Sequence, residues 1–119
     1  VCGEGRFDEI SICGPTKVSH LKNGEVKTFE ITPEEFGFKR AVMGDIVGGD
    51  ARENARILKG ILMGEKGTKR DMVLLNSGAA LAAAGRAAGI KEGIKTAEES
   101  IDSGKAYEKL ERLIEFTGK

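Results

Sequence analysis

Residues 68–88 read TKRDMVLLNSGAALAAAGRAA. Between Val73 and Ala84 almost every side chain is apolar, so a helix built from this segment has hardly any polar face. A helix that is apolar nearly all round must be packed on several sides. Gly78 and the alanines favour close approach of neighbouring backbones, because their side chains are small. We expect this helix at the centre of the fold, and its need for partners indicates an adjoining sheet outside these 119 residues.

Three amphipathic helices are predicted around this central helix. The first begins at a capping box, with Asp50 as N-cap and Glu53 three residues later, and continues to Gly64. The third follows Ser103, which we predict as its N-cap. The apolar stripes expected to face the core are Ala51, Ala55, Leu58 and Leu62 in the first helix, Ile90, Ile94, Ala97 and Ile101 in the second, and Ala106, Leu110, Leu113 and Ile114 in the third.

The first part of the chain carries strand signals. Ile10 and Ile12 alternate with smaller side chains, as in a half-buried strand that ends at Gly14. Asn23 and Gly24 then predict a β-hairpin, since this pair takes the positive φ angles of a type I′ turn. The turn fixes the register, and the expected cross-strand pairs are Leu21 with Val26, Val18 with Phe29 and Lys22 with Glu25.

A short helix is predicted directly after the hairpin. Thr32 and Glu35 form its capping box, Pro33 takes its first position and Gly37 ends it. The whole chain therefore consists of a strand, a β-hairpin and a cluster of about four helices, in a single unit that covers residues 1–119. Taken alone, this order indicates an α+β fold.

Composition and charge exclude several classes of protein. Hydrophobic residues make up 39% and charged residues 32% of the chain, as in globular proteins rather than disordered or membrane ones. No apolar run approaches the roughly 20 residues that cross a bilayer. The 19 basic and 19 acidic residues leave no net charge to attract nucleic acid. Two cysteines and no signal-like leader favour the cytoplasm, with Cys2 and Cys13 as free thiols, although their spacing also allows a disulfide.

Most motif-like patterns have a simple structural interpretation. The Gly-Gly-Asp of residues 48–50 could cradle a phosphate, but its aspartate stands where a helix N-cap is expected. His20 is the only histidine and lies mid-hairpin, so a zinc site or a cysteine–histidine dyad has no support. Lys66, Lys69 and Arg70 are interpreted as a solvated helix entrance, with contact to a phosphate as the alternative. These patterns identify no catalytic residue and no organic-cofactor site.

Asp8 and Glu9 form the one pair with a more specific chemical interpretation. Adjacent carboxylates on a regular strand point to opposite faces, but on a loop both can approach one hard cation. Magnesium suits such a pair, because it keeps several waters and is shared between one or two carboxylates and a substrate phosphate. The alternative is a solvated pair of surface acids.

Five blocks of the sequence, in the same order, resemble the C-terminal region of anthranilate phosphoribosyltransferases. They are GRFDEIS at residues 5–11, GPTKV at 14–18, ITPEEFG at 31–37, GGDARENA at 48–55 and KRDMVLLN at 69–76. The resemblance covers essentially the whole chain. One departure is Cys2, which stands where the family commonly has a histidine.

The resemblance implies an α/β fold class, with residues 1–119 as the C-terminal part of the family's α/β domain. The helical dimerisation domain and the glycine-rich pyrophosphate loop would lie upstream. In this family the acidic pair that matches Asp8 and Glu9 binds the Mg²⁺ that accompanies phosphoribosyl pyrophosphate. The implied enzyme is a cytoplasmic homodimer of tryptophan biosynthesis that transfers phosphoribosyl to anthranilate and has no nucleic-acid or membrane partner. Without the upstream part, the chain is expected to be inactive.

Two alternatives remain open from the sequence. A pyrimidine nucleoside phosphorylase has a similar fold but handles phosphate and a nucleoside, and the five blocks fit it less well. A non-catalytic binding or assembly module is the second alternative. A start codon near Val1, without upstream coding for the pyrophosphate loop, would favour that module.

Overall fold

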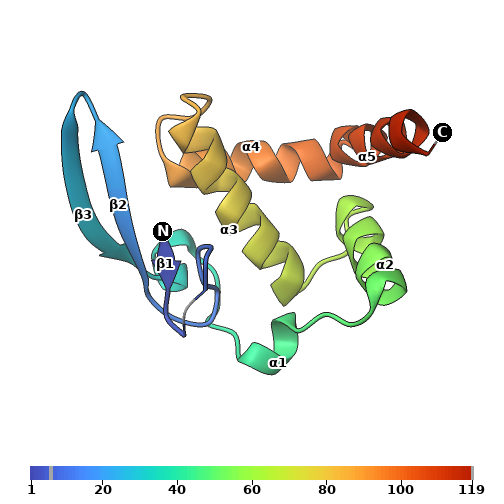
Figure 1. The fold of residues 1–119 in the computed structure, drawn as a ribbon, viewed down its shortest axis with the longest axis horizontal. Helices are drawn as coiled ribbons and strands as arrows, with labels where there is room; N and C mark the ends of the chain where they lie inside the picture. The colour runs from blue at the N-terminus through green and yellow to red at the C-terminus, as the bar shows by residue number, and fades with distance from the viewer. Residues whose placement is uncertain (6, 119) are drawn as a thin grey trace.

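The computed structural model describes residues 1–5 and 7–118, so Arg6 of the block at residues 5–11 lies outside the described residues. A short strand, a hairpin and a cluster of helices follow one another along the chain (Figure 1). The elements are β1 (Cys2–Gly3), β2 (Thr16–Lys22), β3 (Glu25–Ile31), the 3-10 helix η1 (Pro33–Phe36), α1 (Met43–Ile46), α2 (Ala51–Leu62), α3 (Thr68–Ala83), α4 (Ile90–Asp102) and α5 (Lys105–Thr117). The strands form one antiparallel sheet in the order β1-β2-β3. None of the described helices is long and apolar enough to span a membrane.

The β2–β3 hairpin has the predicted register. Asn23 and Gly24 take φ angles of 52° and 81° at the turn. The three predicted pairs are confirmed: Leu21 with Val26, Val18 with Phe29 and Lys22 with Glu25. The hairpin projects from the helices at one end of the molecule (Figure 1). Most of its side chains are exposed, so the local turn fixes this register with little help from burial.

Both predicted N-caps begin helices, but the reciprocal capping box closes only at η1, because the Glu53 side chain of α2 bonds Arg56 instead. Thr32 N–H donates to Glu35 Oε1 at 3.0 Å at the start of η1. At the start of α2, Glu53 N–H donates to Asp50 Oδ1 at 2.8 Å. Each bond satisfies a backbone donor that the first turn of a helix leaves without a partner.

The strand predicted from Ile10 and Ile12 is wrong. Residues 10–13 form no strand, and three consecutive residues from Ile10 are buried, without alternation. Their backbone groups pair with side chains and with a distant loop, instead of with a neighbouring strand. The pairs are Ile10 N–H and C=O with the Asn76 side chain, Ser11 N–H with Thr16 Oγ1, and Ala41 N–H with Ile12 C=O. The strand of the sheet that precedes the hairpin is instead β1, eight residues upstream of Ile10 at its start.

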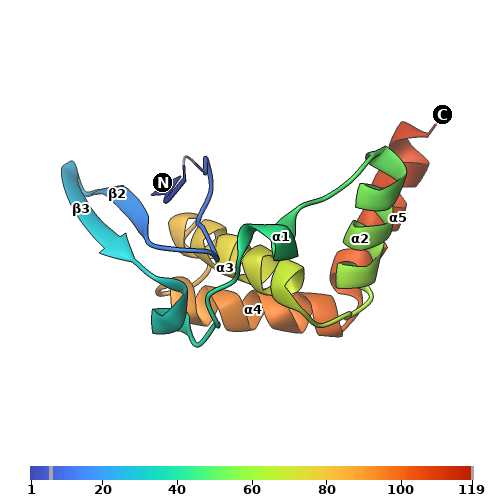
Figure 2. The ribbon, with the colours of Figure 1, turned by 90° about the horizontal axis from the view of Figure 1, so that it is seen from below.

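Helix α3 packs on α4 across the middle of the molecule (Figures 1 and 2). The two helices cross at Gly78 and Gly93, which are both buried. A Cβ atom added at Gly78 would lie 2.7 Å from the backbone nitrogen of Ile94, closer than packed atoms tolerate. Glycine therefore permits this crossing, as predicted for Gly78 from its small size.

Neighbouring leucines place α3 in two hydrophobic clusters. Leu75 packs in a cluster with Ile10, Ile12 and Ile31 from the first part of the chain. Leu74 belongs to a second cluster, together with Ile61, Ala97 and Ile101. Successive residues of an α-helix point about 100° apart, so one helix can serve both cores. This arrangement confirms that α3 is packed on more than one side.

Two predicted stripes face the core of this chain only in part, through Leu62 of α2 and Ala106 of α5. In α2, Ile57 and Ile61 pack in the cluster around Leu74, whereas Ala51, Ala55 and Leu58 are exposed. Both faces of α2 carry apolar pairs four residues apart, and the position of α3 decides which face is buried. In α5, Leu113 and Ile114 are also exposed. Helices α2 and α5 lie side by side at the end of the molecule opposite the hairpin (Figures 1 and 2).

The predicted N-cap of α5 is also wrong. Ser103 is the C-cap of α4, and Gly104 is the N-cap of α5. Gly104 has a φ of 79°, which lies in the left-handed region that glycine adopts readily. The sharp connection between the two helices therefore places glycine, and not serine, at the start of α5.

Candidate functional site

We call residues 8–15 the acidic loop, which joins the region of β1 to β2. Asp8 and Glu9 occupy a bend, and both side chains are exposed. The residue before them, Phe7, is tied to β1 because its carbonyl accepts the N–H of Gly3 at 3.0 Å. The residue after them, Ile10, is buried with 3% exposure. The two carboxylates are thus carried by a two-residue bend between two anchored residues.

Asn76 of α3 holds the acidic loop from the inside. Its Oδ1 accepts the N–H of Ile10 at 2.9 Å, and its Nδ2 donates to the C=O of Ile10 at 2.9 Å. Sequence reasoning placed Asn76 in the central helix and missed this contact. The available signal was an amide side chain directly after Leu74 and Leu75 in an otherwise apolar helix, where a residue of low helix propensity needs a reason.

The chemistry of the acidic loop fits magnesium better than a metal that prefers nitrogen or sulfur. Among residues 1–5 and 7–118, no three His, Cys, Asp or Glu side chains gather closely enough to hold a metal. His20 is exposed on the hairpin, and Cys2 and Cys13 are free thiols. Burial, and secondarily the charge of Asp45, raises the pKa of the Cys13 thiol, which disfavours a thiolate ligand. Two adjacent carboxylates with room for water match the usual magnesium donor set.

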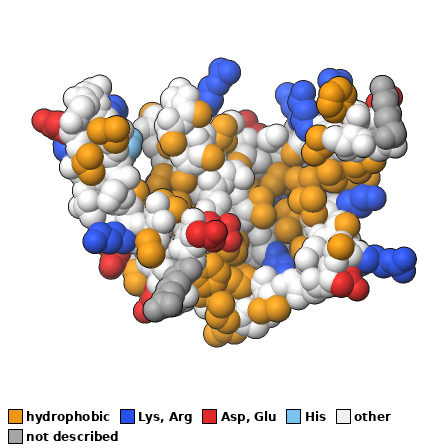
Figure 3. Space-filling model, viewed as in Figure 1, with side chains coloured by type: hydrophobic (Ala, Val, Ile, Leu, Met, Phe, Trp, Pro, Cys, Tyr) orange, Lys and Arg blue, Asp and Glu red, His pale blue; other side chains and the backbone are white. Residues whose placement is uncertain are grey.

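An apolar groove of about 570 Å³ lies next to the acidic loop. Glu9 and Asn76 line its edge. Its apolar walls come from α1, α2 and α3 and consist of Ile46, Ile57, Leu58, Ile61, Met72 and Val73. In the space-filling view, hydrophobic side chains gather between the central helix and the α2–α5 pair (Figure 3). The predicted stripe residue Leu58 therefore faces this groove instead of the core.

Arg70 is not part of a solvated helix entrance, which corrects the prediction. Its side chain is 2% exposed and pairs with Asp102 at 2.8 Å and with Glu98 at 3.4 Å. Partial desolvation raises the pKa of Asp102, but hydrogen bonds from Arg70 and Lys66 outweigh it, so the net pKa is lowered. These ion pairs join the start of α3 to α4.

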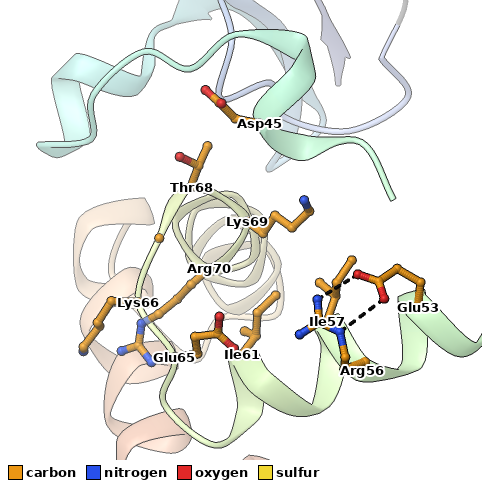
Figure 4. Close-up of a pocket in the computed structure, with 11 residues that line it drawn as sticks. Asp45, Glu53, Arg56, Ile57, Ile61, Glu65, Lys66, Thr68, Lys69 and Arg70 are labelled. Atoms are coloured by element: carbon orange, nitrogen blue, oxygen red, sulfur yellow. Dashed lines mark hydrogen bonds and ion pairs between the residues drawn. The ribbon is translucent and has the colours of Figure 1, made fainter. Parts of the chain in front are cut away.

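Lys66 and Lys69 lie at a smaller pocket beside the start of α3. Figure 4 shows them there with Arg70, and with the ion pair between Arg56 and Glu53 on α2. Lys66 is 67% exposed and pairs with the same acids of α4 as Arg70, whereas Lys69 also lines the apolar groove. The acidic side chains of this pocket balance most of its positive charge, which makes it a poor phosphate site.

The Gly-Gly-Asp of residues 48–50 is a helix entrance, as predicted. Asp50 caps α2 through Glu53, and Gly49 N–H donates to Asn54 Oδ1 at 2.9 Å. Asn54 Nδ2 returns a bond of 2.9 Å to the C=O of Gly49. Two of the amides that a bound phosphate could use, those of Gly49 and Glu53, are therefore already occupied by the chain itself.

Comparison with known proteins defines the class of this fold. A family model described as "Glycosyl transferase family, a/b domain" matches residues 1–107. The chain belongs to this family. Its strand, hairpin and helices are thus part of a glycosyl transferase α/β domain, in agreement with the predicted fold class.

Among sequence relatives, the chain is similar to anthranilate phosphoribosyltransferases. It is 52% identical over 118 residues to the protein of this name from Desulfosudis oleivorans, an alignment that covers 98% of the chain and 35% of that relative. The protein from Methanobrevibacter smithii is 50% identical over 117 residues, with 98% of the chain and 35% of the relative covered. The chain thus spans about a third of the length of these relatives.

Solved structures of anthranilate phosphoribosyltransferases have a fold similar to that of this chain. The crystal structure of anthranilate phosphoribosyltransferase from Thermus thermophilus matches with a TM-score of 0.85 and 41% identity, over 96% of the chain and 33% of that structure's chain. The Saccharomyces cerevisiae enzyme in complex with PRPP and Mg matches with a TM-score of 0.86 and 34% identity, over 96% and 33% of the two chains.

Proposed function

We propose that this chain is the C-terminal part of an anthranilate phosphoribosyltransferase. That enzyme transfers the phosphoribosyl group of phosphoribosyl pyrophosphate to the amino nitrogen of anthranilate and releases pyrophosphate. The observation that carries the proposal is the 52% identity to the Desulfosudis oleivorans enzyme over 98% of the chain. The relatives above share this name, which favours the transferase over a pyrimidine nucleoside phosphorylase or a non-catalytic module. The intact enzyme would act as a cytoplasmic homodimer in tryptophan biosynthesis, without nucleic-acid or membrane partners.

Within that reaction, Asp8 and Glu9 would hold Mg²⁺. Their adjacency, their exposure and the bend that carries them support this role. A second source of support is the yeast relative, whose structure is described as a complex with PRPP and Mg. When bound, magnesium neutralises negative charge on the departing pyrophosphate. The contribution of this chain is to keep two carboxylates on one short anchored bend, with Glu9 at the edge of the apolar groove.

The remaining two thirds of the enzyme would supply the pyrophosphate loop and the anthranilate site. The apolar groove supports such a division, because Leu58 is 44% exposed there and Val73 is only half-buried. Exposed apolar surfaces beside polar residues are typical of sites that another polypeptide segment covers. Residues 1–119 would therefore form one wall of the active site.

A chimera tests the proposal directly. The upstream two thirds of the Desulfosudis oleivorans enzyme are joined to residues 1–119 of this chain, and pyrophosphate release is measured with anthranilate, phosphoribosyl pyrophosphate and Mg²⁺. We expect Mg²⁺-dependent turnover by the chimera and none by residues 1–119 alone. The double variant Asp8→Asn with Glu9→Gln should raise the half-saturating Mg²⁺ concentration by at least about tenfold, because both proposed ligands lose their charge.

Glu25→Gln is the matched control, since it removes one carboxylate at the tip of the hairpin and should leave the Mg²⁺ titration unchanged. A chimera that folds but shows no turnover would refute the proposed activity. An unchanged Mg²⁺ titration in the double variant would leave the activity standing and refute the role of Asp8 and Glu9.

A further inference from the structure

We propose that Asn76 is a positioning residue for the metal-binding carboxylates. Its side-chain amide fixes the backbone of Ile10, the residue directly after Glu9, and so determines how Asp8 and Glu9 present their oxygens to Mg²⁺. This inference rests on the proposed function, from which the role of the two carboxylates comes. It adds a residue that contacts neither metal nor substrate and acts through the loop.

The hydrogen bonds of Asn76 define a single orientation of its amide. Oδ1 accepts from Ile10 N–H at 2.9 Å, while Nδ2 donates to Ile10 C=O at 2.9 Å and to Met72 C=O at 3.1 Å. Carbonyl oxygens can only accept, so the NH₂ group must face them and the amide oxygen must face the Ile10 N–H. Both N–H bonds of the amide and one lone pair of its oxygen are thus used. The side chain is held by its own helix and, at the same time, holds a residue 66 positions away.

The same junction is fixed by apolar packing. Ile10 is 3% exposed and shares a hydrophobic cluster with Leu75, the neighbour of Asn76 on α3. Leu75 therefore contributes burial at this point, while Asn76 contributes the direction of the backbone. Packing restrains the side chain of Ile10 but does not fix the direction of its backbone N–H and C=O groups. The two hydrogen bonds from Asn76 fix that direction.

The anchored residue is close enough to the carboxylates to matter for metal binding. Phe7 on one side is held by a hydrogen bond from Gly3 N–H, and Ile10 on the other by the Asn76 side chain. Only Asp8 and Glu9 lie between these fixed points. In an extended strand the two side chains would point to opposite faces. A bend is required to bring both toward one cation, and Asn76 holds the end of that bend at Ile10. Partners that orient metal ligands change metal affinity by about 10-fold to 100-fold when they are removed.

The test uses the chimera and two variants with different defects. Asn76→Ala removes all three hydrogen bonds. Asn76→Asp keeps the shape and the acceptor for Ile10 N–H, but it places a carboxylate oxygen against two carbonyls. Asn23→Asp is the matched control, because it makes the same chemical change at an exposed turn position where aspartate is also favoured.

The first measurement is hydrogen exchange of the Ile10 amide, which needs no enzymatic activity. We expect clearly faster exchange in Asn76→Ala, which loses the acceptor for Ile10 N–H, and a smaller increase in Asn76→Asp, which keeps that acceptor but repels the carbonyls of Ile10 and Met72. Exchange should be unchanged in Asn23→Asp. Circular dichroism identifies any variant that fails to fold. Two variants with different shape and charge are used so that the test can be completed with one if the other fails to fold. Unchanged exchange at Ile10 in a folded Asn76 variant would overturn the proposal.

The second measurement is the Mg²⁺ titration of turnover. Both Asn76 variants should raise half-saturating Mg²⁺ by about 10-fold to 100-fold, with a smaller effect on kcat at saturating Mg²⁺. In a Glu9→Gln background, Asn76→Ala should add little, because both changes act on the same site. Faster exchange at Ile10 with an unchanged titration, or fully additive effects in the double variant, would make Asn76 a purely structural residue and overturn the proposal. Inactivity of the unmodified chimera would instead refute the proposed function, and with it the inference.

Discussion

The acidic loop and the β2–β3 hairpin follow each other in the chain but are held in opposite ways. The hairpin is fixed by its own backbone ladder and by a two-residue turn, and most of its side chains are exposed. The acidic loop has no ladder of its own, and only Phe7, the residue before it, bridges to β1. It is fixed by buried side chains and by an amide from α3. The difference shows that a segment of fixed shape at a candidate site does not have to be an element of regular structure.

The largest expected effect that separates the two regions is the loss of a buried isoleucine. Ile12 has 0% exposure in the cluster with Ile10 and Leu75, so Ile12→Ala should lower the free energy of unfolding by about 2–5 kcal/mol. Val26 is 64% exposed on the hairpin, and Val26→Ala should change it by less than about 0.5 kcal/mol. Urea denaturation of the chimera measures both. Equal losses would show that the hairpin is packed as tightly as the loop.

The same difference decides how much of the fold could be predicted. The hairpin register follows from Asn23 and Gly24, which are local signals, and it was predicted pair by pair. The strand expected around Ile10 failed, because its backbone partners are side chains that no local pattern reveals. The predicted stripe of α2 was right only at Leu62, for a related reason. Periodicity identifies that a helix has apolar faces, but the position of α3 decides which face is buried.

The candidate site was predictable only in part. Asp8 and Glu9 are adjacent in the sequence, so their proximity was certain, and the family resemblance supplied their expected chemistry. Asn76 lies 66 residues from the loop that it holds, and nothing in a single sequence joins the two. Arg70 was expected in solvent, because charged residues are almost never fully buried unless they are paired, and its partners on α4 could not be foreseen.

A smaller effect is expected from a single buried hydroxyl. Thr16, the first residue of β2, is 1% exposed, and its Oγ1 reaches back to accept the N–H of Ser11 in the acidic loop at 2.9 Å. Thr16→Val keeps the shape but leaves that buried N–H without an acceptor, which should cost about 1–3 kcal/mol. Between the two hairpin strands, Thr28→Val removes an equally short but exposed bond of 2.9 Å to Ser19, which water can replace, so the cost should stay below about 0.5 kcal/mol.

Urea denaturation of both threonine variants in the chimera tests whether burial, and not bond length, separates the two regions. The acidic loop should also show the change locally, because the Ser11 amide should exchange faster in Thr16→Val. If Thr28→Val costs as much as Thr16→Val, the hairpin depends on its side-chain bonds and the proposed contrast fails.

The smallest effect concerns the one strict requirement of the hairpin, which is backbone conformation. Gly24 has a φ of 81° and no other atom within 4 Å of an added Cβ, so Gly24→Ala introduces strain without a clash. A left-handed conformation costs an ordinary residue about 1–2 kcal/mol, and the exposed turn should relieve part of it, leaving a loss of about 1 kcal/mol.

Gly44 is the matched control. It also has open space around an added Cβ but lies in α1, where alanine is the better helix former by about 1 kcal/mol. Gly44→Ala should therefore stabilise the chimera or leave it unchanged. Equal destabilisation by both alanines would mean that the φ of Gly24 is not what fixes the hairpin, and the register would then have to come from packing, as in the acidic loop.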